Sequence, residues 1–116
     1  MKYLLTALLV GAGTLFALSG CSKGNLTTPS CNVPNAGALT YMANVKPIVD
    51  KNCISCHGAN RTAPGDFRTY EGIKPYLSSG TFSDLVVVRQ SMPPAGSLPQ
   101  TQIDSINCWI QAGYVK

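Results

Sequence analysis

The stretch from Cys53 to His57, Cys-Ile-Ser-Cys-His, constrains the fold of this chain more than any other. It is a C-x-x-C-H motif, the attachment pattern of a c-type haem. On a helix the thiols lie three residues apart and His57 lies four residues after Cys53, so the three side chains share one face. Each thiol can then bond a vinyl group of the haem while the imidazole ligates the iron. We therefore expect one covalently bound haem c.

Two other uses of this motif predict different surroundings. A thioredoxin-like dithiol has the same C-x-x-C spacing, but it belongs beside a strand-helix-strand pattern, which the sequence around Cys53 lacks. A structural zinc site needs four ligands, whereas His57 is the only histidine and there is no second C-x-x-C pair. Haem attachment is therefore favoured over both alternatives.

The N-terminal segment has the features of an export signal. Lys2 gives it a positive start, residues 3–18 are almost wholly apolar, and Leu18-Ser19-Gly20-Cys21 ends it with small residues before a cysteine. The segment resembles a bacterial lipoprotein signal, which implies cleavage before Cys21 and acylation of that cysteine. Removal of residues 1–20 from the 116-residue chain leaves 96 residues held to a membrane by lipid.

The alternative for this segment is an uncleaved N-terminal anchor, although its apolar run is short for a spanning helix. In either case we expect the domain to lie outside the cytoplasm, in the cell envelope. Ser22 follows the lipid cysteine, and the sorting rule of Gram-negative lipoproteins favours the outer membrane when a serine stands there. The domain would then face the periplasm or the exterior.

The remaining cysteines can pair, because export places thiols in an oxidising compartment. Of the five cysteines, Cys21 and the motif pair are assigned, which leaves Cys31 and Cys108. A disulfide between them would join the N-terminal tether to the last predicted helix and close a long loop, worth about 4 kcal/mol in the chain-entropy model. The alternative is two independent thiols, since pairing cannot be deduced from sequence alone.

Charge points to no macromolecular partner in particular. The formal net charge of +4 includes Lys2, which leaves with the signal, and the two propionates of a haem would offset most of the rest. Lysine and arginine are scattered without a run, so we expect a solvated surface and no nucleic-acid interface. Arg68 and Arg89 are candidates for neutralising a propionate.

The mature chain is interpreted as a tether followed by one small domain. Residues 21–40 are rich in Ser, Thr, Asn, Gly and Pro and have no apolar periodicity, which predicts a flexible leash. Residues 41–116 carry helical patterns separated by turn residues, which predicts an all-α domain of three to five short helices. A haem would supply apolar surface that a domain of this size struggles to bury alone.

Four segments are assigned to helix. The first leads into the motif, with Asn44 as its expected N-cap and Pro47 in its first turn. Residues 69–77 form the second, and residues 82–89 are assigned to helix because an isolated strand would have no partner. The last should end near Gly113. At its start, Leu98 and Ile103 have the spacing of a hydrophobic staple, and Gln102 is in the capping-box position. Its apolar stripe repeats at three and four residues, with Ile103, Ile106 and Ile110.

The second axial ligand of the iron has one main candidate. Histidine is excluded because His57 is the only one. Met1 leaves with the signal and Met42 precedes the attachment helix, which leaves Met92. Met92 is followed by two prolines that disfavour helix and stiffen the loop, and thioether ligation opposite histidine raises the reduction potential. The alternative is a methionine that only fills space in the core.

The imidazole of His57 needs a partner for its second nitrogen. Ligating histidines donate that N–H to a carboxylate, a backbone carbonyl or water. The polar loop of residues 58–66 follows directly, so we expect one of its backbone carbonyls to accept, with that of Pro64 as the candidate.

Five stretches of the domain are recognisable together: residues 44–49, 53–58, 70–72, 91–94 and 108–113. From about Tyr41 to Tyr114 they resemble the small class I cytochrome c domains of bacteria. The resemblance implies one haem c, with His57 proximal and Met92 distal to the iron, and first and last helices that cross near the haem. Two departures concern the last helix: Pro99 stands where such domains usually have a serine or threonine cap, and Cys108 is unusual there.

The expected function is outer-sphere electron transfer by a membrane-tethered carrier. Covalent attachment would retain the cofactor, two axial ligands would keep the iron six-coordinate, and an exposed haem edge would face redox protein donors and acceptors. We expect no enzymatic activity and no small-molecule substrate, because the acidic residues are dispersed and His57 is committed to iron. Two alternatives remain: a haem enzyme or gas sensor in which Met92 dissociates, and a structural lipoprotein without haem, stabilised by a disulfide.

Overall fold

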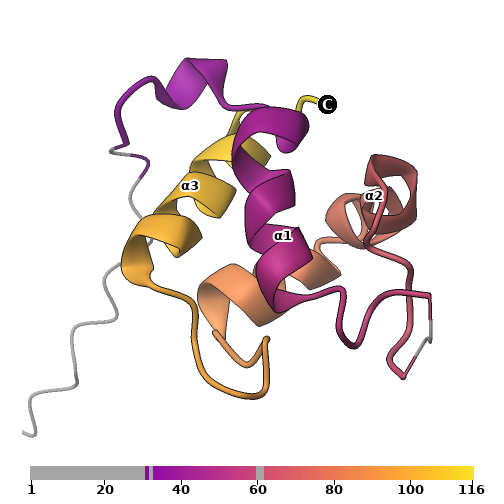
Figure 1. Cartoon of the computed structure of the whole chain (residues 1–116). Helices are drawn as coiled ribbons and strands as arrows, with labels where there is room; N and C mark the ends of the chain where they lie inside the picture. The colour runs from indigo at the N-terminus through magenta and orange to yellow at the C-terminus, as the bar shows by residue number, and fades with distance from the viewer. Residues whose placement is uncertain (1–30, 32, 60–61) are drawn as a thin grey trace, which may run out of the picture.

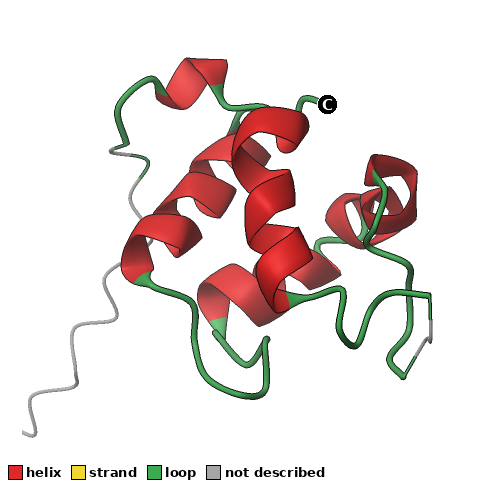
Figure 2. Ribbon diagram, in the orientation of Figure 1, coloured by secondary structure: helices red, strands yellow, loops and turns green. Residues whose placement is uncertain are grey.

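Every regular element of the computed structural model is helical within the residues that it describes, 31, 33–59 and 62–116 (Figures 1 and 2). This confirms the all-α prediction. The predictions for the export signal and Cys21 lie outside the described residues. The elements are the α-helices α1 (Lys46–Asn52), α2 (Tyr70–Ser78) and α3 (Gln100–Gln111), the single 3-10 turn η1 (Ala36–Ala38), and the wide π-helical turns η2 (Tyr41–Val45) and η3 (Ser83–Val88).

The first helical segment begins earlier than the predicted cap at Asn44, which is wrong. Its N-cap is Thr40, whose hydroxyl accepts a hydrogen bond from the Ala43 N–H at 3.3 Å. The Asn44 side chain still takes part, because its Oδ1 accepts from the Thr40 N–H at 3.0 Å. Both side chains can satisfy free donors at a helix start, so the spacing alone did not distinguish them.

The wide turn η2 runs directly into α1, and Pro47 explains the change of pitch. Pro47 lies in the first turn of α1, as predicted. A proline has no N–H to donate, and its ring clashes with the carbonyl four residues before it. Just before Pro47, the Lys46 N–H donates to the Tyr41 carbonyl five residues back. The wider turn thus moves the chain away from the clash without ending the helix.

Helix α3 has no side-chain cap, and Gln102 completes no capping box although it lies in the capping-box position. Its N-cap is Pro99, and a capping box requires the N–H of the N-cap residue, which proline lacks. Gln102 donates its backbone N–H to the Pro99 carbonyl at 2.9 Å, but its buried Oε1 has no hydrogen-bond partner. The staple pair of Leu98 and Ile103 is buried as predicted, and apolar packing therefore defines this helix start.

The core lies where α3 packs against η2 and η3 (Figure 1). Trp109 on α3 is fully buried, with its ring centroid 5.9 Å from that of Tyr41 in η2. The C-terminal residues close this packing, because the Val115 carbonyl accepts from both Trp109 Nε1 and the Tyr41 N–H, at 2.7 and 2.9 Å. Helix α3 ends as predicted, with Gly113 in the left-handed region at φ 91°.

The end of the expected leash is packed on the domain. Leu39 is buried in the core, and η1 precedes it. The structure also brings Cys31 and Cys108 to disulfide distance, with 4.8 Å between their Cα atoms, as the cysteine count predicts. Cys31 is exposed and Cys108 is fully buried on α3. The chain is therefore fastened to the last helix before the helical domain begins.

We expect Cys31→Ala with Cys108→Ala to lower the free energy of unfolding by about 4 kcal/mol, because the disulfide closes a long loop in the unfolded chain. The two cysteines are 77 residues apart. The measurement is urea unfolding with and without a thiol reductant. Reductant should destabilise the parent protein by a similar amount and leave the double variant unchanged. A parent protein insensitive to reductant would contradict the predicted bridge.

Candidate functional site

The four residues predicted to bind haem, Cys53, Cys56, His57 and Met92, line one cavity of about 640 Å³. That volume lies within the range of about 300–1,000 Å³ found for ligand pockets. The described part of the wall contains no Asp, Glu, Lys or Arg. Much of the wall is aromatic or aliphatic, as in Phe67, Tyr76, Phe82, Leu85, Val86 and Pro93. The size and apolar character of this cavity suit a large, flat, mostly apolar cofactor.

The attachment motif folds as a turn directly after α1. The helix ends at Asn52, and Cys53 is its C-cap. The Cys56 and His57 N–H groups both donate to the Cys53 carbonyl, at 3.2 and 2.8 Å. These bonds retain the three- and four-residue spacing on which the sequence argument depends, although the motif lies beyond the regular helix.

The environment of Cys53 favours the neutral thiol over the thiolate that a reactive dithiol needs. Neither Cys53 nor Cys56 is in a disulfide. Reactive dithiols depend on a lowered thiol pKa, which favours the nucleophilic thiolate. Burial instead raises the pKa of Cys53 to about 11. The environment of Cys53 therefore speaks against thioredoxin-like chemistry.

The imidazole of His57 has the partner predicted for it. His57 Nδ1 lies 2.6 Å from the Pro64 carbonyl oxygen. A carbonyl can only accept, so in the neutral imidazole Nδ1 carries the proton and Nε2 keeps its lone pair. Nε2 is the nitrogen that can bind a metal, and the bond to Pro64 fixes this tautomer.

A second contact of His57, with Phe67, was not predicted. The two rings are stacked, with centroids 4.4 Å apart and planes 4° from parallel. The Phe67 N–H also donates to the His57 carbonyl at 2.7 Å. Gly65, which lies between His57 and Phe67 in the sequence, has a φ of 92°. A Cβ at Gly65 would lie 2.7 Å from the Phe67 ring and 2.8 Å from the Tyr76 ring. The Pro64-Gly65 turn thus lets the chain double back and place Phe67 on the imidazole.

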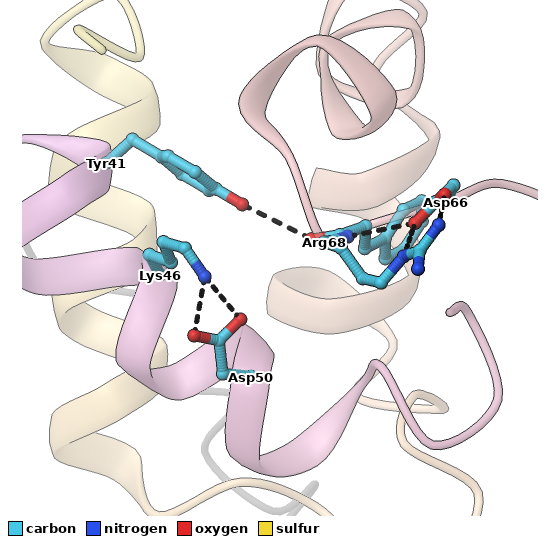
Figure 3. A network of polar contacts seen from close by, with 6 residues as sticks. Tyr41, Lys46, Asp50, Asp66 and Arg68 are labelled. Carbon is cyan, nitrogen blue, oxygen red and sulfur yellow. Dashed lines mark hydrogen bonds and ion pairs between the residues drawn. The ribbon is translucent and has the colours of Figure 1, made fainter. Parts of the chain in front are cut away.

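One hydrogen bond joins the loop around Phe67 to the helical segment of η2 and α1, and an ion pair lies within the loop (Figure 3). Tyr41 Oη donates to the Phe67 carbonyl at 3.3 Å. On the same loop, Arg68 forms an ion pair with Asp66 and donates from Nε to Oδ1 at 2.8 Å. Tyr41 is fully buried, so its phenol has been removed from water. This contact ties the loop carrying Pro64 and Phe67 to the core.

Tyr41 predicts a pH dependence of stability at alkaline pH. Burial, followed by the charge of Asp50, raises its pKa from 10.0 to about 12. The folded state favours the neutral phenol, so this contribution is complete below pH 10 and is lost as the pH rises to about 12. The loss is at most about 3 kcal/mol. Urea unfolding between pH 9 and pH 12 should fall less steeply for Tyr41→Phe, and parallel curves for variant and parent would contradict the assignment.

The two arginines considered for neutralising a propionate each pair with a carboxylate of this chain. Neither Arg68 nor Arg89 is part of the cavity wall. Each forms an ion pair with a nearby carboxylate, Arg68 with Asp66 and Arg89 with Asp84. In each pair the two residues are close in sequence, so the local backbone conformation brings the carboxylate to the arginine. The polar groups on the wall are uncharged, and they come from Asn52, Ser55, Thr62, Tyr76 and Thr81.

Met92 is half-buried on the cavity wall and packs against the core. The Met92 and Ser91 N–H groups both donate to the Leu85 carbonyl, at 3.2 and 2.9 Å. The following prolines, Pro93 and Pro94, also line the cavity. Because η3 carries Leu85, these bonds fasten the methionine loop to a packed element. Met92 thereby lines the same cavity as the motif cysteines and His57.

No family model, curated protein or solved structure matches this chain. Among residues 31, 33–59 and 62–116, no helix combines the length and apolar character needed to cross a membrane. In the same ranges, no three His, Cys, Asp or Glu side chains gather closely enough to hold a metal ion by themselves. The functional assignment therefore depends on the motif and on the geometry of the cavity.

Proposed function

We propose that this chain is a monohaem c-type cytochrome of the small class I type, and that it carries electrons while tethered to a membrane through a lipid on Cys21. One observation carries the proposal: Cys53, Cys56 and His57 share a cavity with Met92, which comes from a different part of the chain. Thioether-forming thiols, an imidazole with a free Nε2 and a thioether are the groups that a His/Met-ligated haem c requires.

Each of these residues would have a separate task. Cys53 and Cys56 would hold the macrocycle, His57 Nε2 would be the permanent axial ligand and Met92 Sδ the second one. When bound, the haem supplies a one-electron couple between ferric and ferrous iron. The bond from His57 Nδ1 to Pro64 keeps the ligand in one tautomer, and the apolar wall keeps water away from the site. Both features favour a stable six-coordinate centre.

The partners in this proposal are redox proteins of the cell envelope. Outer-sphere transfer needs an accessible cofactor edge and no substrate pocket, so the proposal includes no enzymatic reaction. Cys56 is exposed, as are Thr62 and Pro94, and all three belong to the cavity wall. These residues supply an uncharged surface next to the cofactor through which electrons can pass to a partner.

The test is the visible spectrum of the full chain, expressed with its signal and with haem-maturation machinery. A low-spin c-type spectrum in both redox states supports the proposal. A high-spin ferric spectrum would indicate an open axial position and favour the haem enzyme or gas sensor. A protein without haem would leave the disulfide-stabilised lipoprotein.

The membrane part of the proposal has its own test. Cells fed radiolabelled palmitate should incorporate label into the parent chain, and the labelled protein should fractionate with the outer membrane. Cys21→Ser should remain unlabelled, because the acylated group is the cysteine itself. An unlabelled parent chain would refute lipidation and leave the electron-transfer proposal standing.

A further inference from the structure

We propose that Phe67 is a positioning residue that fixes the plane of the His57 imidazole and thereby sets the electronic state of an iron ligated by that histidine. The inference rests on the proposed function, because it concerns the permanent axial ligand. It goes further by assigning a role to a residue outside the C-x-x-C-H motif.

The hydrogen bond to Pro64 is not sufficient to fix the ring. It holds His57 Nδ1 at 2.6 Å from the carbonyl and selects the tautomer. A ring held at Cβ and at one nitrogen can still rock about the line that joins these two points. The face of Phe67, 4.4 Å away and within 4° of parallel, blocks that movement. The hydrogen bond to Pro64 and the stacked ring of Phe67 together fix the orientation of the imidazole plane.

Phe67 can serve as a reference plane because its own position is determined from several sides. Its ring makes edge contacts with Tyr76 and Phe82, at centroid distances of 5.1 and 6.1 Å, both at 69°. Its backbone is held at both polar atoms, since its N–H donates to the His57 carbonyl and its carbonyl accepts from Tyr41 Oη. Its side chain is buried, with 5 % of the residue exposed. The ring therefore has little freedom to follow His57.

The plane of an axial imidazole matters because it aligns the ligand orbitals with particular iron orbitals. In a low-spin ferric haem this alignment determines how unpaired spin is distributed over the macrocycle. The four haem methyl groups report that distribution as paramagnetic NMR shifts. Loss of the stacked face should therefore change the methyl shifts even where the haem stays attached.

The experiment compares three variants of the haem-loaded chain by proton NMR in the ferric state. Phe67→Leu removes the flat face and keeps an apolar side chain, and it should redistribute the methyl shifts. Phe67→Tyr retains the face and should restore the pattern of the parent protein. Tyr114→Leu is the matched control, because Tyr114 is a partly buried aromatic residue that contacts Trp109 and is not part of the cavity wall. It should leave the pattern nearly unchanged.

Unchanged shifts in Phe67→Leu, or equal changes in Tyr114→Leu, would overturn the inference. Should Phe67→Leu fail to fold, the ferrous parent protein decides, because stacked rings must give nuclear Overhauser effects between the Phe67 and His57 ring protons. Their absence would also overturn it. A parent chain that acquires no haem would refute the proposed function and the inference together, whereas a haem protein lacking these effects would refute the inference alone.

Discussion

Met92→Ala should convert a low-spin, six-coordinate iron into a high-spin one and lower the reduction potential. Alanine has no group that can ligate iron, and the other sulfur donors in the described part of the cavity wall belong to the attachment motif. Thioether ligation favours ferrous iron, so its loss favours ferric iron. Axial ligands tune haem potentials over about 0.8 V, and we expect a decrease on the order of 0.1 V or more. The measurements are the ferric visible spectrum and a redox titration.

Met42→Ala is the matched control for this experiment. Met42 is 58 % exposed and lies on η2, and it is not part of the cavity wall. Its replacement should change neither spectrum nor potential. An unchanged ferric spectrum in Met92→Ala would show that Met92 does not ligate the iron, and its place in the core would then be its whole role.

Cys53→Ala with Cys56→Ala should abolish covalent haem attachment and strongly destabilise the domain. Both thioether bonds would be lost, and the cavity of about 640 Å³ would have no cofactor to fill it. The apolar wall then stays in contact with water, at a cost of about 25 cal/mol per Å². Because each kcal/mol shifts the melting temperature of a small domain by about 4–8 °C, we expect Tm to fall by more than about 10 °C.

Two readouts separate attachment from folding in this variant. Haem staining after denaturing electrophoresis reports the covalent bond, and circular dichroism reports helix content and Tm. Ser55→Ala is the control, because Ser55 is exposed within the same motif and carries no thiol. Covalent haem remaining in the double alanine variant would contradict the assignment of these cysteines.

The features that the sequence predicted well depend on local spacing or on simple counting. The helix before the motif and the helix ending near Gly113 follow from apolar spacing and from terminal residues. The pairing of Cys31 with Cys108 was expected from an even remainder of cysteines, once an oxidising compartment was inferred from the N-terminal segment. The Pro64 carbonyl is near His57 in sequence, so a short loop was enough to predict that contact.

The features that it missed depend on tertiary contacts or on competition between two local signals. Thr40 and Asn44 can both cap a helix. The wide turn η2 before Pro47 makes the helical segment begin earlier, which places Thr40 and not Asn44 at the N-cap. Tyr41 and Phe67 meet although they are 26 residues apart, and no periodicity connects them. The stacking of Phe67 on His57 had one local signal, a Pro-Gly turn just before an aromatic residue.

Covalent attachment of one haem at Cys53 and Cys56 can be measured by mass spectrometry of the denatured parent chain. The protein should be expressed with haem-maturation machinery and digested after its intact mass has been measured. Covalent attachment predicts the mass of one haem added to each chain, found in the peptide that contains Cys53 and Cys56. A chain of unmodified mass, or haem that separates from the polypeptide on denaturation, would contradict it.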